Sequence, residues 1–229
     1  MTISLTKDSS YPAIILREGR PARWDDYVTL RDDVALERAR LFFNEGWLWV
    51  DMRAEMINHA SISELFTMLF YVWATQHPDQ VLTSLGRCLL EKSPIKAGAP
   101  DLVLYLGNSY PHWQLGELRR IDLQQWPTPN LVGEISDTTL TIDLDEKKRI
   151  YEALEVPEYW VIDVQGQRVF IFQLQNNQRY QECRESTVLA GLSVNVLNQS
   201  LQKLTEASNT QVAAFLSQQL STYLPSDNY

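Results

Sequence analysis

Three charged side chains lie in apolar stretches of the chain where they could act together chemically. Asp101 opens the apolar run LVLYL, and Glu134 lies in the middle of the run LVGEIS. Lys147 falls on the apolar stripe of a predicted helix, whereas Lys148 and Arg149 are turned away from that stripe. Because a buried charge needs a partner or a metal ion, we expect the two acids and Lys147 to share one site.

The residue types at this predicted site favour hydrolysis of a phosphodiester. Two carboxylates at the ends of neighbouring central strands could hold a hard divalent cation such as Mg²⁺ or Mn²⁺. A lysine beside them could orient or activate a water molecule, or stabilise charge on a phosphate. Two of the three also have a structural interpretation, with Asp101 as a turn acid and Lys147 as a lysine whose stem covers the sheet, whereas Glu134 within a central strand is harder to explain as structure.

Two further side chains are candidates for accessory roles. Asp143 lies four residues before Lys147, so it is either a helix cap or ion-pair partner, or part of the site. His59 precedes a predicted helix and is either a polar residue near its cap or a contact to water or phosphate.

The elements that must position these residues follow from the hydrophobic pattern. The apolar runs at 100–106 and 130–136 predict buried central strands. Periodicity predicts a helix over 143–155 that ends before Pro157, followed by a strand over 159–163.

Other elements are predicted on both sides of this central region. A helix over 61–76 is expected, with Ser61 as N-cap and Glu64 completing a capping box. The remaining predictions are a hairpin over 41–50, a strand over 80–91, a long connection over 107–128, a hairpin over 168–183, a short strand within 188–197 and an amphipathic helix over 211–224.

Composition limits the classes of function. The 229 residues carry a net charge of -9, which argues against a protein that coats nucleic acid through bulk charge. Contact with phosphates would then be confined to a local groove, for which Arg119 and Arg120 are candidates, although such surface charges usually only interact with solvent. Two distant cysteines and the absence of a long apolar run predict a cytoplasmic protein with no membrane segment.

The motifs at these positions resemble the PD-(D/E)XK nuclease superfamily, and more narrowly the Uma-two family of restriction-endonuclease-like proteins. The resemblance covers about residues 41–180. Its central motifs are PDLV (100–103), VGEIS (132–136), DLDEK (143–147), EVPEYW (155–160) and VID (161–163). Two positions depart from the pattern. Ser136 stands where the superfamily has its lysine, which the family resemblance places at Lys147, and Glu155 replaces a helix-end glycine.

The resemblance implies an α/β fold with a restriction-endonuclease-like αβββαβ core, a mixed central sheet flanked by helices, added terminal hairpins and a C-terminal helix. We expect an N-terminal arm (1–37), a nuclease-like domain (38–200) and a helical extension packing on it (201–229). The implied function is a Mg²⁺- or Mn²⁺-dependent endonuclease that acts on DNA, with Asp101 and Glu134 as metal ligands and Lys147 as the third catalytic residue. A homodimer is the assembly that the resemblance suggests, because cleavage of a duplex needs two cuts. The alternatives are a catalytically silent relative that binds nucleic acid or a protein partner, and an assembly protein that uses the long connection and the terminal helix.

Overall fold

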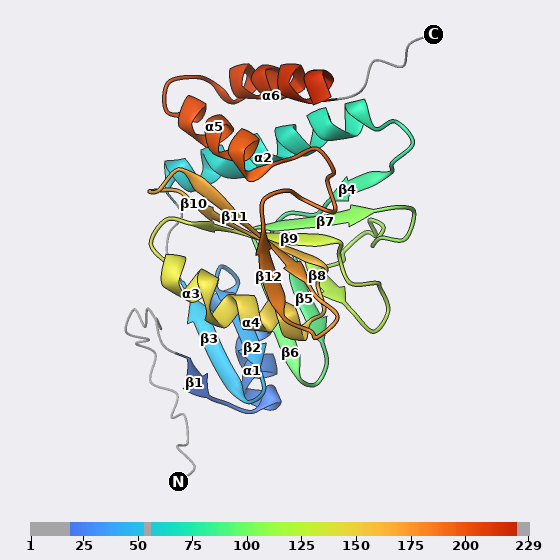
Figure 1. Cartoon of the computed structure of the whole chain (residues 1–229). Coiled ribbons are helices and arrows are strands. Elements are labelled where there is room, and N and C mark those ends of the chain that lie inside the picture. Colours follow the sequence, from blue (N-terminus) through green and yellow to red (C-terminus); the bar gives the residue numbers. More distant parts are fainter. Residues whose placement is uncertain (1–18, 53–55, 224–229) are drawn as a thin grey trace.

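The computed structural model describes residues 19–52 and 56–223, which form two mixed β-sheets with helices packed around them (Figure 1). The first 18 residues of the predicted N-terminal arm (1–37) lie outside the described residues. The predicted domain boundaries at 37 and 200 stay predictions. Of the helices in the described ranges, none combines the length and apolarity of a membrane span.

The central sheet holds the two strands that carry the predicted acids. Its strand order is β12-β11-β10-β9-β7-β4, in which β9 and β10 are parallel and the other neighbours antiparallel. All residues of β9 and β10 are buried, as expected for strands covered on both faces. The strands are β4 (Leu82–Ser84), β7 (Leu102–Leu106), β9 (Leu131–Ser136), β10 (Glu158–Asp163), β11 (Arg168–Leu174) and β12 (Tyr180–Cys183).

A second sheet, with the order β1-β3-β2-β6-β5-β8, packs below the central one in Figure 1. The predicted hairpin over 41–50 is its β2–β3 pair, and the turn residues Glu45 and Gly46 have φ of 47° and 84°. The strands are β1 (Arg20–Pro21), β2 (Arg40–Asn44), β3 (Trp47–Asp51), β5 (Leu89–Lys92), β6 (Lys96–Gly98) and β8 (Arg120–Asp122).

Helices cover both faces of the central sheet (Figure 1). On one face α2, α5 and α6 share a core with inward residues of β7, β9, β10 and β11. On the other face α4 packs between the central sheet and the second sheet. The helices are α1 (Trp24–Arg31), the 3-10 helix η1 (Val34–Leu36), α2 (Ile57–Gln76), α3 (Leu140–Leu144), α4 (Glu146–Ala153), α5 (Val194–Leu204) and α6 (Asn209–Tyr223).

The alternation along β9 directs Glu134 toward α4 and the second sheet. Leu131 and Ile135 belong to the core beneath α2, whereas Val132 belongs to the core beneath α4. Since successive side chains of a strand point to opposite faces, Glu134 shares the face of Val132. The predicted αβββαβ core is confirmed as α2, β4, β7, β9, α3 with α4, and β10.

Several predicted elements differ in the structure for local reasons. Helix α2 begins at Ile57, so the capping box at Ser61 is wrong, and the Ser61 hydroxyl instead contacts Asn209 of α6 at 3.3 Å. The single helix predicted over 143–155 is two helices, because Asp145 leaves helical geometry with φ -121° and ψ -80°.

Two predicted strands are also corrected. The strand over 80–91 is split between the sheets as β4 and β5, and Arg87 between them has φ 61°. The predicted strand within 188–197 is wrong, because Ser193 caps helix α5 by accepting a hydrogen bond from the Val196 amide. The long connection over 107–128 contains β8, which pairs in parallel with β5.

Glu155 occupies the left-handed position at the end of α4 that glycine normally takes. Its φ is 62°, and the Val156 amide donates to the Tyr151 carbonyl at 3.2 Å, which is the hydrogen bond of a Schellman motif. Its exposed ion pair with Lys92, at 2.7 Å, contributes little. The family's glycine is therefore absent here while the geometry that it serves is retained.

Glu155→Gly is expected to make the protein more stable than Glu155→Ala. Both variants lose the ion pair with Lys92, but only glycine avoids the steric cost of a β-carbon at positive φ. The expected difference is about 1 kcal/mol in the free energy of unfolding, measured by urea denaturation. Equal stability of the two variants would show that the left-handed position costs nothing here.

Candidate active site

Neighbouring strands bring the two predicted acids side by side. Leu102 of β7 pairs with Gly133 of β9, so the residue before Leu102 lies next to Glu134. The Asp101 amide donates to the Gly133 carbonyl at 2.9 Å, and Asp101 Oδ2 accepts from the Ile135 amide at 2.7 Å. Asp101 is fully buried, and its carboxylate is fixed by the backbone of the strand that carries Glu134.

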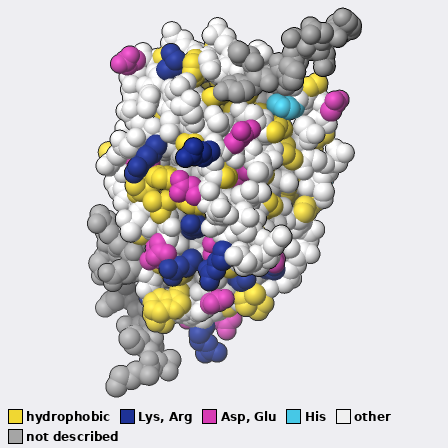
Figure 2. Space-filling view, in the orientation of Figure 1, with side chains coloured by type: hydrophobic (Ala, Val, Ile, Leu, Met, Phe, Trp, Pro, Cys, Tyr) yellow, Lys and Arg dark blue, Asp and Glu magenta, His cyan; other side chains and the backbone are white. Residues whose placement is uncertain are grey.

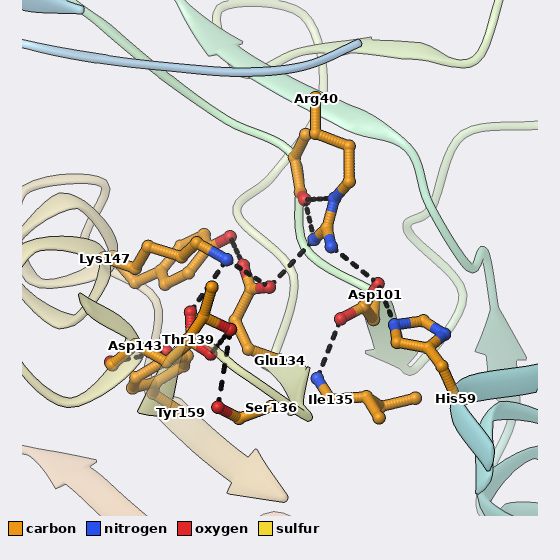
Figure 3. A network of polar contacts seen from close by, with 12 residues as sticks. Arg40, His59, Asp101, Glu134, Ile135, Ser136, Thr139, Asp143, Lys147 and Tyr159 are labelled. Carbon is orange, nitrogen blue, oxygen red and sulfur yellow. Dashed lines mark hydrogen bonds and ion pairs between the residues drawn. The ribbon is translucent and has the colours of Figure 1, made fainter. Parts of the chain in front are cut away.

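Glu134 is the centre of the polar network drawn in Figure 3. Its Oε2 accepts from Lys147 Nζ at 2.9 Å and from Arg40 Nη2 at 2.8 Å, and its Oε1 accepts from the Tyr151 hydroxyl at 2.5 Å. Because Glu134 is only 1% exposed, these three donors replace the water that a carboxylate would otherwise bind.

Lys147 points inward from α4, on the face expected from its helical spacing. Its Nζ lies 2.8 Å from Asp143 Oδ1 and 4.6 Å from the centre of the Phe42 ring. Lys148, one residue further along, instead places its ammonium 4.0 Å from the centre of the Phe172 ring. The lysine that meets Glu134 is therefore Lys147, which is 5% exposed.

Both accessory candidates join the same network. His59, from α2, places Nε2 3.2 Å from Asp101 Oδ1. Asp143 is fully buried at the end of the short helix α3, where its Oδ2 accepts from the Thr139 hydroxyl at 2.6 Å. The ammonium of Lys147 therefore lies between the carboxylates of Asp143 and Glu134 and contacts both (Figure 3).

Arg40 joins this network although the sequence analysis did not single it out. It comes from β2 in the second sheet, and its Nη1 lies 3.0 Å from Asp101 Oδ1 while Nη2 reaches Glu134. The guanidinium also donates to the Ala99 carbonyl, from Nε at 3.0 Å and from Nη2. Nothing in the sequence indicates that the side chain of an arginine beside a predicted hairpin will contact acids of a different sheet.

The predicted phosphate contacts lie elsewhere. Arg120 is on β8, at the edge of the second sheet, and pairs with Asp32 at 3.0 Å and with Glu91 at 3.5 Å. Arg119 directly precedes that strand and is exposed. On the face shown in Figure 2, Lys and Arg side chains are interspersed with Asp and Glu. The structure therefore does not bring Arg119 and Arg120 together with Asp101 and Glu134.

The environments of the two acids move their pKa values in opposite directions. Burial would raise the pKa of Asp101, but the Arg40 charge and the His59 hydrogen bond outweigh it, so the pKa is lowered. Burial raises the pKa of Glu134, with help from Asp101 and Asp143 and against the charges of Lys147 and Arg40. Burial alone would lower the pKa of Lys147, yet Asp143 and Glu134 raise it, so Lys147 stays charged.

The donor chemistry fits a small divalent cation at one position. Asp101 Oδ1 and Glu134 Oε2 contact the two terminal nitrogens of the Arg40 guanidinium, so both carboxylates face the same cationic group. Within the described ranges no three His, Cys, Asp or Glu side chains are grouped to hold a metal. Mg²⁺ suits such a pair, because it keeps several waters and commonly binds through one or two carboxylates.

Comparisons with known proteins bear on the family and the fold. A sequence model of the Uma2 family, described as "Putative restriction endonuclease", matches residues 24–207. Among solved structures, the chain resembles "a putative nuclease belonging to DUF820" from Anabaena variabilis, with a TM-score of 0.51 and 18% identity over 86% of this chain and 99% of that chain. At this identity the likeness concerns the fold. No curated protein matches the chain.

Proposed function

The chain belongs to the Uma2 family of restriction-endonuclease-like proteins, and we propose that it is a metal-dependent endonuclease that hydrolyses phosphodiester bonds of DNA. One observation carries the proposal. The carboxylates of Asp101 and Glu134 lie side by side on neighbouring strands, with the Lys147 ammonium 2.9 Å from Glu134.

Asp101 and Glu134 are the residues that would hold Mg²⁺ or Mn²⁺. When bound, such an ion supplies Lewis-acid polarisation of a phosphoryl oxygen. The Ile135 amide and His59 keep the Asp101 carboxylate oriented, and the Tyr151 hydroxyl fixes Glu134 Oε1 by a hydrogen bond. Preorganised ligands of this kind bind without the cost of reorientation during the reaction.

Lys147 would stabilise the charge that develops on the phosphate, or position the attacking water. Its ammonium stays protonated because its pKa is raised, which suits electrostatic stabilisation better than proton abstraction. Asp143, at 2.8 Å, fixes the ammonium beside Glu134. We assign Asp143 a positioning role through Lys147.

A second function from another class is favoured by the Arg40 ion pairs. With Arg40 between them, the two acids already have a cation partner, as in a purely structural network. A catalytically silent relative that binds nucleic acid or a protein partner would have this arrangement. The net charge of -9 also suits such a protein better than one that binds nucleic acid through bulk charge.

A nuclease assay with Mn²⁺ on supercoiled, linear and single-stranded DNA and on RNA separates the two functions. We expect cleavage of DNA by the wild-type protein, its loss in EDTA, and its return when Mn²⁺ is restored. Glu134→Gln protein, purified in parallel, reports contaminating nuclease. Equal cleavage by both proteins would remove the assignment, and cleavage that survives EDTA would remove the metal.

A further inference from the structure

Arg40 occupies the position at which a cation can contact both acids. Its two terminal nitrogens divide between the carboxylates, at 3.0 Å from Asp101 Oδ1 and 2.8 Å from Glu134 Oε2. We propose that Arg40 is a tethered competitor for the divalent ion, which closes the acid pair in the metal-free protein and must withdraw before the ion binds. This inference rests on the proposed metal-dependent function.

Burial makes Arg40 the member of the network that can leave. Its side chain is 21% exposed, against 6% for Lys147 and 7% for His59. The two acids are 0% and 1% exposed, so solvent and substrate reach them only if a neighbour moves. A long side chain that is about a fifth exposed can swing outward while its strand stays paired.

The charges of the site favour this exchange. Three buried carboxylates, those of Asp101, Glu134 and Asp143, face two permanent cations, Arg40 and Lys147. Withdrawal of Arg40 leaves Lys147 as the permanent cation in contact with these acids among the described residues. Such an excess of buried negative charge is costly, whereas a divalent ion brings twice the charge of a guanidinium to the same two oxygens.

A purely structural role for Arg40 is the competing interpretation. Arg40 links β2 of the second sheet to the central sheet, because its guanidinium also donates to the Ala99 carbonyl. In that case its removal would weaken the fold equally with and without metal. Tethered competition predicts instead that metal restores the stability that the substitution removes, since the ion then replaces the missing charge.

The experiment measures Mn²⁺ binding by titration calorimetry and the melting temperature with and without Mn²⁺. For Arg40→Gln we expect Mn²⁺ to bind at least about tenfold more tightly than to wild type, because no closed state has to be opened first. The melting temperature of this variant should be below that of wild type without metal, and should rise more than that of wild type on addition of Mn²⁺.

Arg31→Gln is the matched control. Arg31 is similarly buried, at 16% side-chain exposure, and pairs at 2.9 Å with the buried Glu91, away from the acid pair. We expect this variant to lose stability while its Mn²⁺ affinity stays that of wild type. Arg40→Lys, which keeps a charge but lacks two separated donors, should bind Mn²⁺ more tightly than wild type by a smaller factor. It serves as the test variant if Arg40→Gln does not fold.

The results of these titrations distinguish failure of the Arg40 inference from failure of the proposed metal-dependent function. If wild type and the folded Arg40 variants bind Mn²⁺ equally, or the variants bind it more weakly, tethered competition is overturned while metal-dependent cleavage stands. If no protein of the set binds Mn²⁺, both the inference and the metal dependence are overturned. If Arg31→Gln also bound Mn²⁺ more tightly than wild type, the higher affinity would come from a general loss of stability. That result would also overturn the inference.

Discussion

Glu134→Gln is expected to lower the rate of DNA cleavage by about 10³-fold or more at a fixed Mn²⁺ concentration, with a smaller loss of stability than Asp101→Asn. Glutamine has nearly the same shape as glutamate, but it removes one of the two charged ligands proposed for the metal ion. The folded protein raises the pKa of Glu134, chiefly through burial. Folding therefore favours the uncharged carboxyl over the carboxylate. A neutral amide avoids that cost of burying a charge, which offsets part of the loss of the ion pairs with Lys147 and Arg40.

Asp101→Asn is the variant whose stability is compared with that of Glu134→Gln. The pKa of Asp101 is lowered, because Arg40 and His59 outweigh the effect of burial. Folding therefore favours the charged form, and its removal should cost about 3 kcal/mol. Cleavage measured with urea denaturation curves for both variants checks the pair. A loss of stability in Glu134→Gln as large as that in Asp101→Asn would contradict the assignment of opposite environments to the two acids.

The central part of the fold was predictable because its constraints are local. An apolar strand with one carboxylate in the middle, and a helix whose inward stripe includes one lysine, can be recognised in a short window. The motif at 155–160 also becomes intelligible in the structure. Glu158 is fully buried and accepts from the Trp160 indole at 2.6 Å and from the Thr187 amide at 2.8 Å. That glutamate therefore holds a connecting segment in place.

The parts that sequence could not predict depend on distant pairings. Strand β5 pairs with β8 across about thirty residues, and the three-residue run of β8 is too short for a periodic signal. The same holds for Arg40, whose partner Glu134 lies 94 positions further along the chain. Sequence patterns identify inward-facing charges on their own elements, but they do not identify which charge from another sheet will meet them.

Tyr151 shows how a core residue can also serve the site. Its side chain is fully buried and packs 5.0 Å from the Tyr159 ring, as its place on the apolar stripe predicts. Its hydroxyl nevertheless donates to Glu134 Oε1, while the Tyr159 hydroxyl donates to the Asp143 carbonyl at 2.8 Å. The aromatic core beneath α4 therefore supplies hydrogen bonds that fix the acids, and repacking it should disturb the site before it unfolds the domain.

Lys147→Met is expected to reduce both stability and cleavage. Methionine fills a similar volume but removes the ion pair of Asp143 and leaves Glu134 paired with Arg40. Loss of one partner from a buried ion pair costs about 3–5 kcal/mol. The rate of DNA cleavage should fall by about 10²–10³-fold, because the charge beside the phosphate is lost. Urea denaturation gives the first quantity, and cleavage below the unfolding transition gives the second.

Lys148→Met is the control that distinguishes the effect of the ammonium's position from the effect of losing one positive charge. It removes the same charge one residue further along, where the ammonium lies over the Phe172 ring and outside the acid network. The loss of that contact should cost at most about 1 kcal/mol and leave the cleavage rate unchanged. Similar losses of activity in the two variants would show that net charge, and not the ammonium beside Glu134, supports the reaction. A stable but inactive Lys147→Met would instead mean that Arg40 alone can balance three buried carboxylates.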